Sequence, residues 1–206
     1  MIAIIDYDMG NLGSIKNMIK KVGGDSIITN DIEIISKARG IILPGVGSFD
    51  TGVNNLKKYK LFELIKDMAI GEKRPILGIC LGMQLMTKRS EEGVMTGLGL
   101  VNAETIKFED DNVHKIPFMG WNTVEKSKES LLFENFSESP RFYFVHSYYV
   151  KCNDDQNVLG QSKYVTLFDS AFEKGNIMGV QFHPEKSHRF GMTFMQGFLK
   201  FVNANE

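Results

Sequence analysis

The sequence has little of what marks several protein classes. Its 206 residues include two cysteines, Cys80 and Cys152, without CxxC spacing, so neither a disulfide framework nor a metal site is expected. The sequence also has no large excess of one charge sign, because its 24 Lys and Arg nearly balance its 25 Asp and Glu. The net charge of −1 gives no field that would attract nucleic acid or an anionic membrane.

Long hydrophobic runs are also absent. No apolar stretch reaches the length of about 18 residues that a membrane span requires. The first residues form a short apolar run broken by Asp6, which indicates a first strand rather than a signal peptide. A cytoplasmic, reducing environment is therefore expected, and it would suit a free thiol.

Residues 76–84 contain the most informative pattern, Ile-Leu-Gly-Ile-Cys-Leu-Gly-Met-Gln. An apolar strand pattern ends at Cys80, and a helix-forming run follows over 83–89. Strand, sharp turn and helix are the parts of a nucleophile elbow, and the flanking glycines avoid collisions with neighbouring elements. The helix N-terminus would favour a thiolate. A buried structural cysteine is the alternative.

A second reactive pattern lies far downstream, where residues 177–185 read Ile-Met-Gly-Val-Gln-Phe-His-Pro-Glu. Pro184 lacks an N–H donor and marks the end of the strand. His183 and Glu185, two residues apart in extended chain, project to the same side. A histidine held by a carboxylate can take a proton from a thiol, so these residues and Cys80 form a coherent catalytic set. Alone, His-Pro-Glu would be compatible with a surface turn.

Strand and helix patterns alternate in the first half of the chain, which predicts parallel pairing through right-handed crossovers. The strands are expected at 2–6, 27–29, 40–43 and 76–79, and the helices at 12–22, 52–58 and 61–69. Ligands of such sheets bind at the carboxyl ends of the strands. Beyond Gly97, strands expected at 105–108, 121–125, 141–150, 158–161 and 166–173 add antiparallel pairing, before a strand at 177–182 and a helix at 189–202. The prediction is one α/β domain over 1–206, with a mostly parallel central sheet flanked by helices and extended by antiparallel strands.

Weaker signals have plain structural alternatives. The loop 44–47, Pro-Gly-Val-Gly, could turn its N–H groups toward a neighbouring oxyanion, or form an ordinary βα turn. Residues 10–13 lack the spacings of phosphate-binding loops, so a helix start is favoured there and no cofactor is expected. The β-prone run 141–150 contains His146 and Ser147, which need polar partners from the protein or from a substrate.

These segments together resemble the class I glutamine amidotransferase family, and within it the glutaminase subunits of imidazole glycerol phosphate synthases. The elbow and the Gly-Val-Gln-Phe-His-Pro-Glu segment match the whole class. Narrower matches follow in family order along the full chain: Asp-Tyr-Asp-Met-Gly-Asn-Leu, Leu-Pro-Gly-Val-Gly, Ser-Glu-Glu-Gly, Met-Gly-Trp-Asn and Phe-Val-His-Ser-Tyr-Tyr. The resemblance implies a flavodoxin-like fold.

The resemblance also implies a role for each matching position. Cys80 would attack the side-chain amide of glutamine, His183 would move the proton, and Glu185 would orient His183. The remaining matches are the oxyanion donors Val46, Gly47 and Leu81, the glutamine-binding residues Gln84, Glu92, His146 and Ser147, and the partner-facing positions Asn11, Trp121, Asn122, Tyr148 and Lys186. The implied partner is a cyclase subunit with a (β/α)8 barrel, which forms a heterodimer and consumes the ammonia in histidine biosynthesis.

One departure from the family leaves alternatives open. Phe118 stands where many members have histidine, a change expected on the interface side. It leaves room for a paralogue that supplies ammonia to a different synthase, such as one amidating a surface sugar. A stand-alone cysteine hydrolase is a further alternative, against which Gln84, His146 and Ser147 argue. A binding subunit without turnover would have no use for an intact triad.

Overall fold

A computed structural model describes residues 1–204. In its first half, strands and helices alternate: β1 (Ile2–Ile5), α1 (Leu12–Lys21), β2 (Ser26–Thr29), α2 (Ile32–Ser36), β3 (Gly40–Leu43), α3 (Phe49–Lys58), α4 (Leu61–Lys66), β4 (Ile76–Ile79) and α5 (Leu81–Leu85). The second half is mostly strands: β5 (Ala103–Lys107), β6 (Phe118–Thr123), β7 (Glu125–Lys126), β8 (Arg141–His146), β9 (Tyr148–Cys152), β10 (Val158–Lys163), β11 (Leu167–Lys174) and β12 (Ile177–Val180), followed by α6 (His188–Ala204). Short helical turns lie at Asp67–Gly71, Asp155–Asn157 and Pro184–Lys186.

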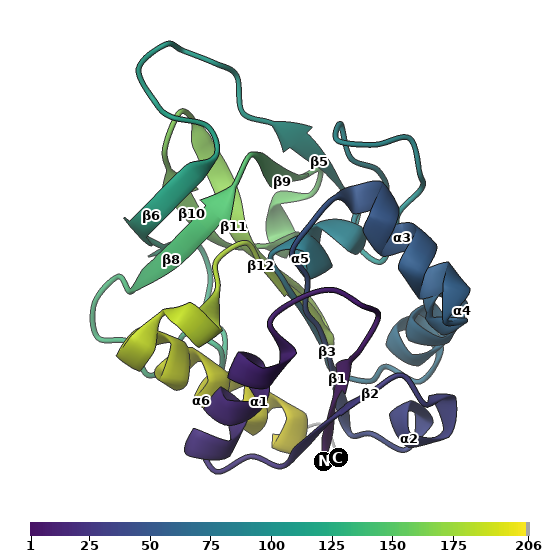
Figure 1. The fold of residues 1–206 in the computed structure, drawn as a ribbon. Helices are drawn as coiled ribbons and strands as arrows, with labels where there is room; N and C mark the ends of the chain where they lie inside the picture. The colour runs from purple at the N-terminus through teal and green to yellow at the C-terminus, as the bar shows by residue number, and fades with distance from the viewer. Residues whose placement is uncertain (205–206) are drawn as a thin grey trace.

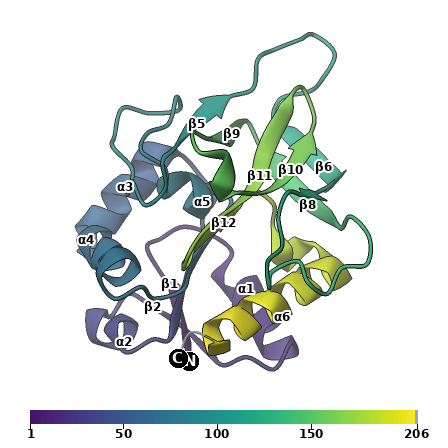
Figure 2. The same cartoon turned by 180° about the vertical axis from the view of Figure 1, so that it is seen from behind.

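A ten-stranded sheet runs through the molecule in the order β2-β1-β3-β4-β12-β11-β10-β7, with β9 pairing β11 and β5 pairing β9 (Figures 1 and 2). The first five strands in this order are parallel, and β11, β10 and β7 continue the sheet antiparallel. The predicted α/β fold with added antiparallel strands is therefore confirmed.

Alternate residues of the short parallel strands supply two hydrophobic layers, as the two-residue period of a strand requires. In β1, Ile2 and Ile4 pack in the layer that contains α1 and α6. Ala3 and Ile5 pack in the opposite layer, with α2, α3, α4 and α5. Figure 1 shows α1 and α6 together on one side of the sheet and α3 and α4 on the other.

The pairing of β4 with β12 positions the candidate site. Both strands are fully buried, and their register places Ile79 beside Val180. The ladder continues one residue further, where the Cys80 amide donates to the Val180 carbonyl over 2.8 Å. The elbow and the segment that carries His183 therefore leave the sheet side by side, although about a hundred residues separate them in sequence.

Several predicted elements differ from those observed. The sequence interpretation has no helix between β2 and β3, yet α2 forms there, with the Asp31 carboxylate capping the amides of Glu33 and Ile34. The helix expected over 83–89 begins earlier and ends at Leu85. It ends there because the segment after Gly97 returns to it, with the Leu98 amide donating to the Leu85 carbonyl over 2.8 Å.

The strand expected over 141–150 is two strands in different sheets. It breaks at Ser147, so that β8 pairs with β6 in a separate two-stranded sheet and β9 pairs with β5 and β11. The expectation that every later strand joins the main sheet is wrong for β6 and β8. Within residues 1–204, no helix has the length and hydropathy needed to cross a membrane.

Candidate active site

Cys80 occupies a strained turn between β4 and α5. Its backbone has φ +54° and ψ −111°, a combination that L-residues rarely adopt. The turn is tight enough to require its glycines: a Cβ on Gly78 would lie 2.7 Å from the Gly82 carbonyl oxygen, and one on Gly82 would lie 1.8 Å from the Leu43 carbonyl oxygen. The side chain is 6% exposed. Because α5 has only five residues, its dipole is a small source of thiolate stabilisation.

His183 and Glu185 follow β12 and form a buried pair. The two atoms that meet are His183 Nδ1 and Glu185 Oε1, at 2.7 Å, with the side chains 2% and 3% exposed. Since a carboxylate accepts, Nδ1 donates and Nε2 is left for other chemistry. The Ser187 hydroxyl fixes the His183 backbone, donating to its carbonyl over 2.6 Å.

Electrostatics favour a charged His183. Burial opposes the charge, but the neighbouring Cys80 sulfur and the Glu185 carboxylate outweigh it and raise the pKa of His183 above its ordinary value. An imidazolium facing a thiolate is the arrangement that a cysteine nucleophile needs.

A cavity of about 270 Å³ opens beside Cys80. It is lined by all the predicted oxyanion and glutamine-binding residues, namely Val46, Gly47, Leu81, Gln84, Glu92, His146 and Ser147, together with Cys80 and Tyr148. Residues from four separate parts of the chain thus meet around one cavity, next to the ends of β3 and β4. The volume suits a ligand of amino-acid size.

Two polar residues of the cavity are already oriented by the protein. Glu92 accepts from the Phe49 amide at 2.8 Å. His146 Nδ1 lies 2.7 Å from the Tyr148 carbonyl oxygen, which can only accept a hydrogen bond. Nδ1 must therefore donate, and Nε2 is an acceptor in the neutral ring. Burial lowers the pKa of His146 to about 4, which keeps it neutral. Its Nε2 is buried with no partner among residues 1–204.

The loop 44–47 adopts one definite orientation. The Gly45 carbonyl accepts from the Leu81 amide at 3.3 Å, so this expected oxyanion donor is engaged by the loop itself. The Tyr7 hydroxyl, fully buried, donates to the Pro44 carbonyl. Gly47 has φ +123°, which favours glycine.

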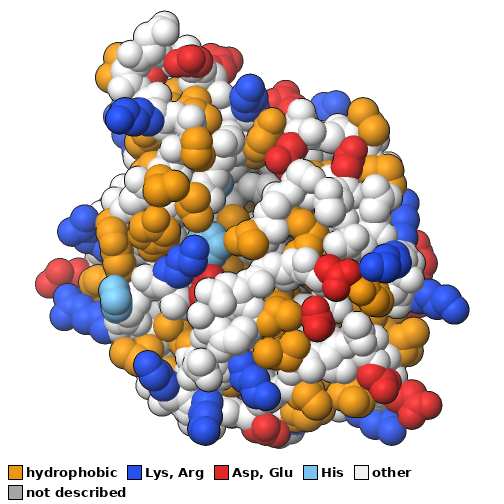
Figure 3. All heavy atoms as spheres, viewed as in Figure 1, with side chains coloured by type: hydrophobic (Ala, Val, Ile, Leu, Met, Phe, Trp, Pro, Cys, Tyr) orange, Lys and Arg blue, Asp and Glu red, His pale blue; other side chains and the backbone are white. Residues whose placement is uncertain are grey.

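The predicted partner-facing residues are spread over neighbouring elements. Trp121, 40% exposed, stacks on His188 at 5.7 Å, and Lys186 lies 5.8 Å from the Tyr143 ring, which Trp121 also contacts. On this face, hydrophobic side chains gather over β6 and β8 (Figure 3).

The other predicted interface positions have different surroundings. Asn11 is exposed at the start of α1, whereas the Asn122 side-chain amide donates to the Lys163 carbonyl and Tyr148 faces the cavity. Phe118, expected on the interface side, is 6% exposed in this chain and stacks on Tyr164 at 4.0 Å.

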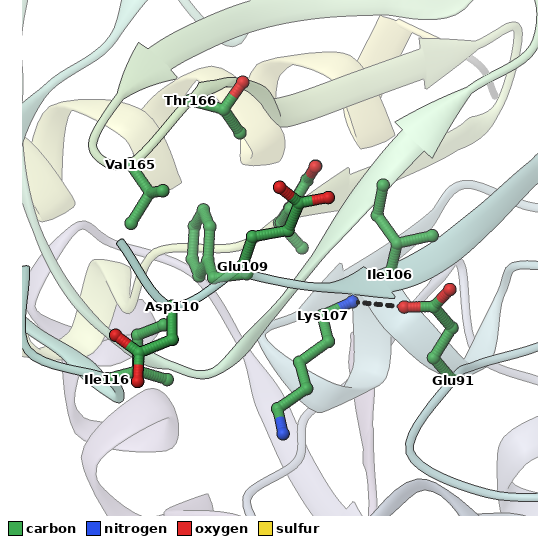
Figure 4. Close-up of a pocket in the computed structure, with 10 residues that line it drawn as sticks. Glu91, Ile106, Lys107, Glu109, Asp110, Ile116, Val165 and Thr166 are labelled. Atoms are coloured by element: carbon green, nitrogen blue, oxygen red, sulfur yellow. Dashed lines mark hydrogen bonds between the residues drawn. The ribbon is translucent and has the colours of Figure 1, made fainter. Parts of the chain in front are cut away.

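Larger cavities lie away from Cys80. One of about 910 Å³ lies between β5 and the turn after β10, with Glu91, Glu109 and Asp110 at its rim (Figure 4). Its walls hold none of the predicted catalytic or glutamine-binding residues. In the part of the chain that is described, no group of three His, Cys, Asp or Glu side chains is placed to hold a metal ion.

Gln181 is a residue that the sequence interpretation missed. It is fully buried, and its side-chain amide donates to the Cys80 sulfur over 3.6 Å. A signal for it existed, because a glutamine inside an apolar strand and two residues before His183 must project toward the same side as the histidine.

Comparison with known proteins agrees with this geometry. A family model described as glutamine amidotransferase class-I matches residues 3–200. Imidazole glycerol phosphate synthase subunit HisH 2 of Methanococcus maripaludis is 59% identical over 200 residues, 97% of this chain and 99% of that protein. The subunit of the same name from Pseudomonas aeruginosa is 41% identical over 98% of this chain and 100% of its own length.

Solved structures share the fold at low identity. One chain of PurLQS from Thermotoga maritima matches with a TM-score of 0.75 at 18% identity, covering 98% of both chains. A glutamine amidotransferase from the same organism matches with a TM-score of 0.65 at 20% identity, covering 98% of this chain and 84% of that one.

Proposed function

Since this chain belongs to the class I glutamine amidotransferase family, we propose that it is the glutaminase subunit of an imidazole glycerol phosphate synthase. It hydrolyses L-glutamine to glutamate and ammonia, and a cyclase subunit uses the ammonia in histidine biosynthesis. The observation that carries this proposal is the meeting of Cys80 with four predicted glutamine-binding residues around one cavity, beside the His183–Glu185 pair.

The first half of the reaction forms a thioester. The Cys80 sulfur attacks the side-chain carbonyl carbon of glutamine, a C–S bond forms, and the carbonyl electron pair moves to oxygen. When that pair returns, the C–N bond breaks. His183 gives its proton to the departing nitrogen, which leaves as ammonia. Glu185 keeps the imidazole oriented throughout, because its carboxylate accepts from Nδ1.

The second half restores the enzyme. Water attacks the thioester carbon while the now neutral His183 accepts one of its protons. The C–S bond then breaks and releases the carboxylic acid, leaving thiolate and imidazolium as before. In sum, glutamine and water become glutamate and ammonia, and no other reactant is needed.

The oxyanion formed in each half needs two donors, and the Leu81 amide is one of them. In the observed conformation it is engaged by the Gly45 carbonyl. We propose that the loop 44–47 must turn before the Val46 and Leu81 amides can both face the substrate. Free glutaminase would then be slow, and the partner subunit would be what stabilises the active loop.

The partner is proposed to be a cyclase of (β/α)8 barrel fold that forms a heterodimer with this chain. The relatives named as synthase subunits support this, and so do the hydrophobic side chains gathered over β6 and β8, where Met119 and Trp121 are 63% and 40% exposed. Ammonia released in the cavity would pass directly to that subunit. Isolating the complex and identifying the co-purified protein would distinguish this partner from the synthase of a paralogous pathway.

The deciding experiment is glutamine hydrolysis by the wild-type complex and by the Cys80→Ser complex. Because triad residues act as a unit, the variant is expected to lose several orders of magnitude in turnover while it still binds its partner. Substantial hydrolysis by Cys80→Ser would rule out the mechanism.

A further inference from the structure

Three buried groups form a chain of hydrogen bonds that ends at the Cys80 sulfur. The Gln84 side-chain amide donates to the Tyr148 carbonyl at 3.1 Å and to Gln181 Oε1 at 3.0 Å. The Gln181 side-chain amide in turn donates to Cys80 Sγ over 3.6 Å. Gln84 and Gln181 are 5% and 0% exposed, so both side-chain amides are almost fully shielded from solvent.

The Tyr148 carbonyl fixes which atoms donate and which accept in this series of hydrogen bonds. A carboxamide can be turned so that its oxygen and nitrogen exchange places, but a backbone carbonyl can only accept. The end of Gln84 that meets the Tyr148 carbonyl must therefore be its NH2 group. That same group meets Gln181, which must present its oxygen there. The end of Gln181 that faces Cys80 is then necessarily the NH2 group.

A donor aimed at sulfur favours the thiolate. Hydrogen bonding to the charged form of an acid stabilises that form, and the N–H of Gln181 cannot accept a proton from a thiol. The titratable side chains near the sulfur are those of His183, which favours the thiolate when it is charged, and Tyr7, whose hydroxyl donates to the Pro44 carbonyl. The Val145 carbonyl oxygen lies 3.9 Å from the sulfur and offers a thiol proton only a weak acceptor. Because the one-turn helix α5 has only a small dipole, a side-chain donor contributes a larger part of the stabilisation of the thiolate.

We propose that Gln181 is a further catalytic residue, which holds the Cys80 sulfur as a thiolate aimed at the substrate. Gln84 is a positioning residue in this proposal, since it keeps the Gln181 amide turned with its donor toward the sulfur. The inference rests on the proposed role of Cys80 as the nucleophile. It also limits what Gln84 offers a ligand: both of its N–H groups are used, so only its oxygen can contact glutamine.

The test is the pH dependence of Cys80 alkylation by iodoacetamide, with the modified residue located by mass spectrometry. Gln181→Met keeps the side-chain length but removes the donor. At pH values below the midpoint of the wild-type profile, we expect alkylation of Cys80 to be roughly tenfold slower in the variant. Gln84→Met should shift the profile in the same direction but less, because the Gln181 amide remains and only loses its fixed orientation.

Gln161→Met is the matched control. Gln161 lies on β10, and its amide donates to Asp169 at 3.0 Å, away from the cavity. This variant removes an amide donor from the same sheet, so its Cys80 alkylation profile should match that of the wild type.

Steady-state kinetics of Gln181→Met give a second readout. Because Gln181 does not line the cavity, its replacement should lower kcat while KM for glutamine stays unchanged.

The alkylation test needs no glutaminase turnover, so it separates this inference from the proposed function. An unshifted profile in folded Gln181→Met protein would overturn the inference even if the wild type hydrolyses glutamine. If Gln181→Met fails to fold, an unshifted profile in Gln84→Met would do the same. An equal shift in Gln161→Met would also overturn it, since the effect would then be general loosening of the sheet.

Discussion

The Leu81 amide donates its hydrogen to the Gly45 carbonyl oxygen, at 3.3 Å, in the resting conformation of this chain. The atom that should stabilise negative charge on a substrate is therefore satisfied by the protein's own backbone. Leu81 directly follows Cys80, and a turn of the loop 44–47 would replace the Gly45 carbonyl with an N–H group. A donor of this kind accounts for roughly a hundred- to thousandfold in turnover.

The loop glycines are expected to be needed for stimulation by the partner. In Gly47→Ala, the backbone would have to keep φ +123° with a side chain, and the new Cβ would lie 2.6 Å from Met9 Cε. Stimulation of glutaminase by the nucleotide-bound partner should therefore fall more than complex formation does. Gly71→Ala is the control, because its Cβ would meet nothing within 4 Å. A free subunit already as fast as the full complex would show that no gate exists.

The two cysteines are expected to differ sharply in their reactivity toward an electrophile that resembles glutamine. A diazo-ketone analogue of glutamine should label Cys80, which borders the cavity, and spare Cys152. Burial and the nearby Asp169 raise the pKa of Cys152 to about 12, so it holds almost no thiolate at neutral pH. Peptide mapping after labelling gives the answer, with Cys152→Ala expected to label like the wild type. Labelling at Cys152 in the folded protein would contradict this account.

Ammonium salt is expected to replace glutamine in the complex. Cys80→Ala removes the source of ammonia but leaves the chemistry of the partner intact. Product formation by the variant complex should be lost with glutamine and regained with ammonium at a pH where ammonia is present. A folded variant complex that stays inactive with ammonium would exclude the proposed division of labour.

His146 is expected to make the fold less stable in mild acid. Its pKa is about 4 in the folded chain, because of burial and then the charge on His183, against an ordinary value of 6.5. Between those two values the unfolded chain binds a proton that the folded chain refuses, so stability falls as the pH falls. The loss amounts to roughly 3 kcal/mol across this window.

The measurement is denaturant unfolding of the wild type and His146→Gln at several pH values between 7 and 4. The variant has no histidine to titrate at this position. As the pH falls, the wild type should therefore lose roughly 3 kcal/mol more unfolding free energy than the variant does. Two curves that stay parallel would show that His146 is not the titrating group.

Local patterns were sufficient to predict where Cys80 and His183 leave the sheet. The glycines around Cys80 and the proline after His183 mark their turns in the sequence itself, and the alternation of elements predicts parallel strands. The one-turn length of α5 could not be predicted, because it depends on where the segment after Gly97 returns. The same holds for the break at Ser147, since β-prone residues continue on both sides of it and only the two different sheets separate them.

Side-chain partners were harder still to foresee. The direction of the Gln181 amide depends on Gln84 and on the carbonyl of Tyr148, three positions that are distant in sequence. Phe118 was expected on the interface side because it stands where many family members have histidine. Its burial against Tyr164 depends on a turn near residue 164 that no local pattern connects with it.

The place of β12 in the sheet has a consequence for how the protein is made. It is the last strand of the described chain to leave the ribosome, yet it lies between β4 and β11 in the middle of the sheet. Until it arrives, β4 presents an unpaired, apolar edge, which is the kind of edge that recruits other chains. A growing chain therefore carries its thiol long before it carries the histidine, so glutamine can be hydrolysed only by a chain whose translation has reached the final strand.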